Sequence, residues 1–206
     1  RMPARHAVVL CALGGLIADA VLTVSLVAAE DEGGFVRLAP VLGLRTRSAQ
    51  PAASTAGSAD SGPATRTASR VLETLRGVEA RLRTTRYQHT TRVREREGLY
   101  AWDCSGMAAW ILDRAAPRAM NAVLGERPVA RDFYRAIARA PVDRPVRGWQ
   151  RLPHIENARP GDVLAWVRPP WFQSTNTGHV AFVLEAPRRV IGLDRAYTVR
   201  IADATS

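Results

Sequence analysis

The order of patterns along residues 67–206 limits the fold, because helical periodicity comes first and short apolar strands follow. Apolar residues recur every three or four positions from Ala68 to about Arg83, which predicts an amphipathic helix. A second helix is predicted over the apolar run MAAWILDRAA after Gly106, which Pro117 ends. A third is predicted over residues 130–140, ARDFYRAIARA, which Pro141 closes.

Three short apolar runs then predict strands at 163–167, 179–184 and 196–201. A turn signal, RPGD at 159–162, precedes the first strand, and Gly192 lies in the turn before the third. Helices followed by a run of neighbouring strands are typical of an α+β domain. We therefore expect N-terminal helices packed on an antiparallel sheet.

The first 66 residues carry a different composition. Residues 7–29 are apolar, follow Arg1 and Arg5, and precede the acidic run at 30–32. This arrangement predicts a secretory signal peptide at 1–29, cleaved after Ala29, or an N-terminal membrane anchor over the same residues. Residues 30–66 are rich in Ala, Ser, Gly, Thr and Pro and predict a flexible linker. We expect an exported protein, periplasmic or in the cell envelope, with its folded domain at 67–206.

The net charge of +10 comes from 29 basic residues, all of them Arg, against 19 acidic ones. A strongly basic chain raises the question of nucleic-acid binding. No helix-turn-helix, zinc or RNP-like motif accompanies the arginines, and export would separate the protein from nucleic acid. We therefore expect no nucleic-acid partner, and membrane contact only through an N-terminal anchor. The sequence makes no prediction of oligomeric state.

The chain contains two cysteines, Cys11 and Cys104. Two are too few for a disulfide scaffold and match no metal-binding spacing, so we expect neither a metal nor another cofactor. Cleavage after Ala29 would leave Cys104 as the single thiol of the mature chain.

Cys104 lies at the predicted start of the second helix, where a helix dipole and free N–H groups favour a thiolate and can also receive an oxyanion. His179 begins a predicted strand after Gly178 and is the candidate general base. Two alternatives remain: Cys104 as a small buried apolar residue, and His179 as a structural residue that bonds a backbone carbonyl.

Three motifs occur in a fixed order: DCSG at 103–106 opening an apolar helix, PGDVL at 160–164, and GHVAFV at 178–183. Together they resemble the NlpC family of papain-like cell-wall cysteine peptidases, over about residue 87 to the C-terminus. The resemblance implies a papain-like α+β fold with Cys104 as nucleophile, His179 as base and Tyr87 near the oxyanion site. It also implies that the substrate is the peptide portion of peptidoglycan, cut at a bond between γ-D-glutamyl and a diamino acid.

The sequence departs from the family where an orienting residue is expected, since members often carry a His on the strand after the base. Here that strand offers Asp203, so Asp203 or a residue beyond Ser206 is the candidate third member. Asp103 is a candidate substrate contact or a helix cap, and Ser105 a candidate substrate or oxyanion contact. The segment RVREREGLYAW before the motif replaces the tryptophan- and glycine-rich surroundings common in the family, so the family's substrate preference is not carried over.

These observations predict an exported cysteine peptidase or amidase acting on peptidoglycan peptides. Two alternatives stay open: a catalytically inactive wall-binding module on the same fold, and an acyltransferase, which would share the acyl-enzyme intermediate.

Overall fold

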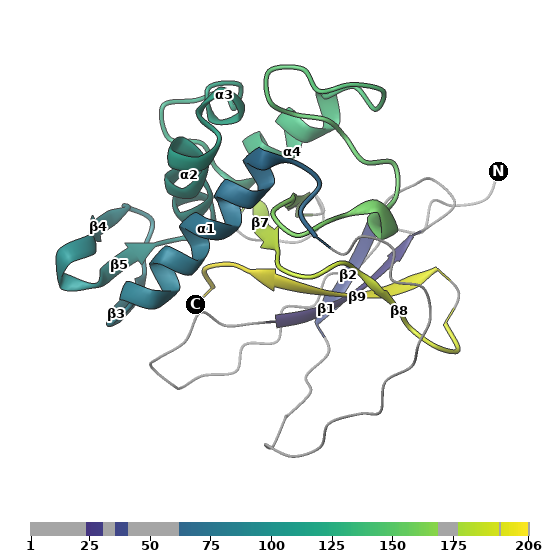
Figure 1. Cartoon of the computed structure of the whole chain (residues 1–206), viewed down its shortest axis with the longest axis horizontal. Helices are drawn as coiled ribbons and strands as arrows, with labels where there is room; N and C mark the ends of the chain where they lie inside the picture. The colour runs from purple at the N-terminus through teal and green to yellow at the C-terminus, as the bar shows by residue number, and fades with distance from the viewer. Residues whose placement is uncertain (1–23, 31–35, 41–61, 169–176, 194, 206) are drawn as a thin grey trace, which may run out of the picture.

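The computed structural model describes residues 24–30, 36–40, 62–168, 177–193 and 195–205. Helices and antiparallel strands confirm the predicted α+β class, with the helices packed over one side of the larger sheet (Figure 1). The helices are α1 (Arg66–Arg81), α2 (Cys104–Ala115), α3 (Pro117–Met120) and α4 (Ala130–Arg139), with 3₁₀ turns η1 (Glu95–Glu97) and η2 (Ile155–Asn157).

The larger sheet has the strand order β2-β1-β9-β7-β6, with β8 also paired to β9, and every pair in it is antiparallel. The predicted strands are β6 (Val163–Val167), β7 (Gly178–Val183) and β9 (Ala196–Ala202), each within one residue of its expected bounds. The remaining strands are β1 (Val24–Glu30), β2 (Val36–Pro40) and β8 (Arg188–Arg189).

Strands β1 and β2 fall inside the segments predicted as signal or anchor (1–29) and linker (30–66). Their backbones extend the sheet, since β1 pairs with β9 and β2 pairs with β1. Residues 1–23, 31–35 and 41–61 lie outside the described residues, so the division of the N-terminal region stays a prediction. Within the described residues, no helix is both long enough and apolar enough to cross a membrane.

A second, three-stranded sheet forms over residues 84–102, including the charged segment RVREREG, for which the sequence predicts a loop. It has the order β3-β5-β4, formed by β3 (Thr84–Tyr87), β4 (Arg92–Arg94) and β5 (Leu99–Trp102), and β3 pairs with β5 in parallel. Strands β3 and β4 are short and largely exposed, so they carry no apolar alternation to predict them. β5 is buried and leads directly into α2, which fixes where α2 begins.

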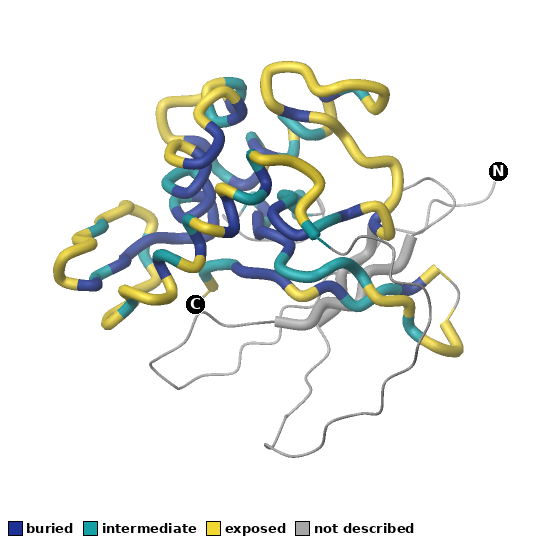
Figure 2. The backbone as a smooth tube through the Cα atoms, viewed as in Figure 1, coloured by how far each residue is buried: buried dark blue, intermediate teal, exposed yellow. Residues whose placement is uncertain are grey.

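The main core lies where α1, α2, α4, β5 and β7 meet, and burial is concentrated there (Figure 2). α1 contributes Val71, Leu75 and Val78 on one face, at the three- and four-residue spacing seen in the sequence. Alternate residues of β7, Val180 and Phe182, face this core, while Ala181 and Val183 belong to a second apolar cluster. Strand β7 is therefore buried on both faces and holds the residue at its start, His179, firmly.

Candidate active site

Helix α2 begins at Cys104, as the sequence predicts, because Asp103 caps it. Asp103 Oδ1 accepts hydrogen bonds from the Gly106 backbone N–H at 2.7 Å and from Ser105 Oγ at 2.8 Å. The first intrahelical hydrogen bond runs from the Met107 N–H to the Asp103 carbonyl. The N–H groups of Cys104 and Ser105 precede it and therefore have no acceptor within the helix. These two N–H groups are the ones that the helix start offers to a negatively charged oxygen, as the sequence analysis expects of an oxyanion site.

Gly106 allows the loop before the site to pack closely on α2. A Cβ at this position would lie 2.3 Å from Thr91 Oγ1 and 3.3 Å from Asp103 Oδ1. A side chain at position 106 therefore requires the Thr91 side chain to shift. Packing around the cap favours the glycine of the DCSG motif.

His179 is the second residue of β7 and directly follows Gly178, a position that requires glycine. Gly178 has a φ of +145°, and a Cβ on it would lie 2.0 Å from the carbonyl oxygen of Trp166. Trp166 pairs with His179 across β6 and β7, and their ring centroids are 4.9 Å apart. The imidazole thus packs against the indole ring at a tilt of 44° and is only 19% exposed.

Asp203 follows directly after β9. Strands β7 and β9 pair only at Phe182–Ala202 and Val183–Ile201, so the start of β7 and the residue after β9 emerge at the same end of the sheet. There His179 Nε2 and Asp203 Oδ2 are 2.6 Å apart, and the Asp203 side chain is 6% exposed. Its other oxygen, Oδ1, is buried without a hydrogen-bond partner. The structure therefore brings together the two residues that the sequence analysis proposed as base and orienting group.

Cys104 completes the group, because its thiol is near enough to His179 to contribute to the pKa of the imidazole. Burial alone lowers the pKa of His179, but hydrogen bonds to Asp203 and Cys104, with the negative charges of both, outweigh it and raise the pKa from 6.5 to about 10. His179 is accordingly an imidazolium at neutral pH. Since Nε2 holds Asp203, the ring nitrogen left for Cys104 is Nδ1.

Tyr87 ends β3 beside this group and is partly exposed. Burial raises the pKa of its phenol, and the negative charges of Cys104 and Asp103 raise it further. The phenol therefore stays protonated near neutral pH and can donate a hydrogen bond. Its position next to both residues is compatible with the predicted oxyanion role.

Asp103 and Ser105, the other predicted contacts, are bonded to each other within the cap. Both are buried, and Asp103 Oδ2 also lies 3.0 Å from His89 Nδ1. Burial alone raises the pKa of Asp103, but hydrogen bonds from His89, Gly106 and Ser105, with the positive charge of His89, lower it overall. Asp103 is thus an ionised helix cap, and a direct substrate contact by Asp103 or Ser105 stays a prediction.

His89 contacts the cap although the sequence favours a turn residue at this position over one that lines the cleft. Its distance of two positions from Tyr87 was the available signal. The pairing with Asp103, fourteen positions downstream, depends on the parallel pairing of β3 and β5, which the charged sequence does not predict.

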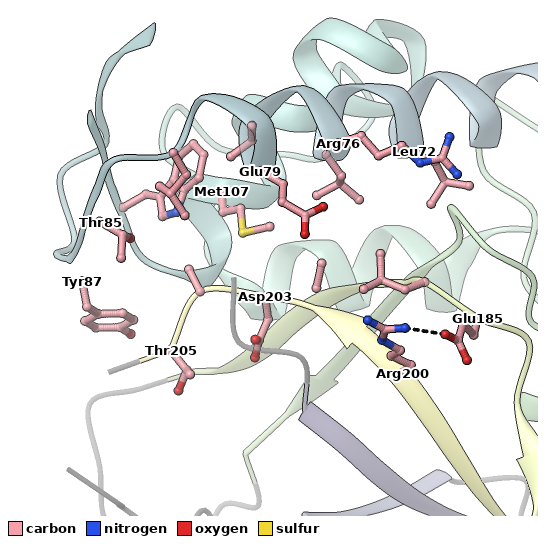
Figure 3. A pocket seen from close by; sticks show the side chains of 17 residues that line it. Leu72, Arg76, Glu79, Thr85, Tyr87, Met107, Glu185, Arg200, Asp203 and Thr205 are labelled. Carbon is pink, nitrogen blue, oxygen red and sulfur yellow. Dashed lines mark hydrogen bonds and ion pairs between the residues drawn. The ribbon is translucent and has the colours of Figure 1, made fainter. Parts of the chain in front are cut away.

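A cavity of about 270 Å³ lies between α1 and the end of β9 (Figure 3). Its walls include Tyr87, Met107 and Asp203, together with Glu79 and Arg76 of α1. Neither Cys104 nor His179 lines it. The cavity therefore borders Asp203, the proposed orienting residue, and does not border Cys104.

No group of three or more His, Cys, Asp or Glu side chains suited to a metal ion occurs in the part of the chain that the structure describes. Comparisons with protein-family models, with curated proteins and with solved structures found no match.

Proposed function

We propose that the protein is an exported cysteine peptidase or amidase with a papain-like fold of NlpC type, which cleaves amide bonds in peptidoglycan peptides. The observation that carries the proposal is the grouping of Cys104, His179 and Asp203, from a helix start, a strand start and a strand end. The raised pKa of His179 supports an imidazolium that can donate a proton to a leaving amine.

The chemistry proceeds in two halves. The Cys104 thiolate attacks the amide carbonyl carbon, and the carbonyl oxygen becomes an oxyanion beside the Cys104 N–H and the Tyr87 phenol. His179 gives its Nδ1 proton to the amide nitrogen, the carbon–nitrogen bond breaks, and a thioester and a free amine result. Water then attacks the thioester while neutral His179 takes its proton, and collapse releases the carboxylic acid and the thiolate.

Asp203 keeps the imidazole in its working orientation through these steps. Its bond to Nε2 fixes the ring so that Nδ1 faces the thiol, and its charge stabilises the imidazolium that protonates the leaving amine. A strand without a histidine in the orienting position would favour the alternative, an inactive wall-binding module. The Asp203 bond argues against that alternative, because a carboxylate supplies the same orienting function.

The substrate class rests on the ordered DCSG, PGD and GHV motifs and on the apolar N-terminal segment that predicts export. A surplus of positive charge is also suited to an anionic wall surface. No described feature favours an acyl acceptor other than water.

The test is digestion of purified sacculi by the full chain, with released muropeptides separated by chromatography. Wild type and a Cys11→Ala control should release new amine and carboxylate ends, and Cys104→Ala should release none. Equal digestion by Cys104→Ala would overturn the mechanism. Release of glycan fragments with intact peptides would overturn the bond assignment.

A further inference from the structure

His89 is held at three points although its side chain is 76% exposed. Its Nδ1 lies 3.0 Å from Asp103 Oδ2, and its ring meets Tyr87 edge-on with centroids 5.9 Å apart. The Arg127 guanidinium donates a hydrogen bond to the His89 carbonyl oxygen. Burial of apolar surface does not explain an ordered side chain this exposed, so its polar contact with Asp103 is the feature to account for.

The negative charge of the Asp103 carboxylate opposes a thiolate at the next residue, Cys104. It is ionised, its side chain is only 12% exposed, and it directly precedes Cys104. Both negative charges act on the Tyr87 phenol, so they lie within electrostatic range of one point. A like charge this close disfavours a thiolate.

The donors to Asp103 differ in what they supply. Ser105 and Gly106 bond Oδ1 with neutral groups, whereas His89 bonds Oδ2 and also contributes positive charge. Arg127 fixes the His89 backbone and brings a guanidinium charge to it.

We propose that His89 is a positioning residue for the Cys104 nucleophile, acting through Asp103. Its Nδ1 bonds Oδ2 of the carboxylate and, when the ring is protonated, offsets the carboxylate charge, so that Asp103 can cap α2 with less negative charge acting on Cys104. The inference rests on the proposed nucleophilic role of Cys104. The charged or titratable groups that face His89 are Asp103, Tyr87 and Arg127, with Cys104 next to Asp103.

The experiment measures the rate of Cys104 alkylation by iodoacetamide against pH. The full chain carries Cys11→Ala, so that Cys104 is its single thiol. His89→Ala should slow alkylation at pH 7 by roughly three- to tenfold and displace the rate profile to higher pH, the range allowing for solvent screening at an exposed histidine. His89→Asn keeps an N–H donor without the charge and should recover part of the rate.

The deciding variant is His89→Ala combined with Asp103→Asn. Asparagine caps a helix as aspartate does but carries no charge, so the double variant should regain most of the wild-type rate. A general loss of structure would not be rescued in this way. His154→Ala, which alters another exposed histidine, is the matched control and should leave the profile unchanged.

An unchanged profile in His89→Ala, or a double variant as slow as the single one, would overturn the inference. Alkylation needs no cell-wall substrate, so the two proposals fail separately. If sacculi stay undigested but the pH profile of Cys104 alkylation depends on His89, only the substrate assignment is wrong. If sacculi are digested but that profile does not depend on His89, only the positioning role is wrong.

Discussion

His179 Nε2 and Asp203 Oδ2 lie 2.6 Å apart, in a place where both side chains are largely buried. Such a contact joins the start of β7 to the end of β9, twenty-four positions apart in the chain. It fixes which imidazole nitrogen faces Cys104, and it makes the charge of His179 depend on a carboxylate that the solvent hardly reaches.

Asp203→Asn should lower kcat on sacculi or a peptide substrate by roughly 10²-fold or more, because the amide keeps the shape but loses the charge that stabilises the imidazolium. NMR titration of His179 should show its pKa falling from about 10 in the wild type. Asp143→Asn, an exposed carboxylate paired only with Arg144, is the control. An unchanged His179 titration in Asp203→Asn would contradict the role assigned to this pair.

Stability should fall as pH rises from about 6.5 to about 10. The pKa of His179 is raised in the folded state, so the folded chain holds a proton that the unfolded chain releases above 6.5. That stabilisation is complete below 6.5 and is lost as pH approaches 10, with each pKa unit worth about 1.4 kcal/mol. Urea unfolding at pH 6, 8 and 10 measures it. The free energy of unfolding should fall less steeply with pH in Asp203→Asn than in the wild type. An equally steep fall in both proteins would count against the coupling between Asp203 and His179.

Gly106→Ala should destabilise the fold by roughly 1–3 kcal/mol, because the new methyl group would lie 2.3 Å from Thr91 Oγ1. Thr91→Ala in the same chain should remove most of that loss. Gly77→Ala in α1 is the matched control, since only the flexible end of Arg81 approaches its Cβ position. It should stabilise the chain by about 1 kcal/mol through helix propensity. Thermal unfolding of the four proteins tests the set, and a destabilisation of equal size in Gly77→Ala would show that the Thr91 contact is not the cause.

Asp103→Ala should cost about 1–2 kcal/mol through loss of the α2 cap. Unlike Asp103→Asn, it should slow Cys104 alkylation, because a frayed helix start no longer presents its N–H groups to the thiol. Thr65→Ala removes the α1 cap, where Thr65 Oγ1 accepts from the Ala68 N–H at 3.0 Å, and should cost about 1 kcal/mol with no effect on alkylation. Denaturant unfolding and iodoacetamide kinetics on both variants separate helix capping from the chemistry of the site. Equal alkylation in the two variants would deny Asp103 any influence on the thiol.

Long elements with a strong pattern could be predicted from the sequence. The apolar spacing of residues 68–83 predicted α1 within two residues of its observed bounds, and the short apolar runs predicted β6, β7 and β9. Their patterns are strong because each buries a face or a whole strand in the core. The small sheet could not be predicted, because β3 and β4 bury almost nothing and are held by backbone pairing to β5.

The sequence by itself determined that Cys104 opens a helix, since Asp103, Ser105 and Gly106 cap it through contacts within three residues of one another. Local hydrogen bonds depend on neighbours in the chain, and a motif can encode them. Only the tertiary structure decided which carboxylate meets which imidazole: Asp203 reaches His179 through the antiparallel pairing of β7 and β9, and Asp103 reaches His89 through the parallel pairing of β3 and β5. Those pairings depend on strand register and on burial of distant segments, so the charges that surround the thiol are set by the fold as a whole.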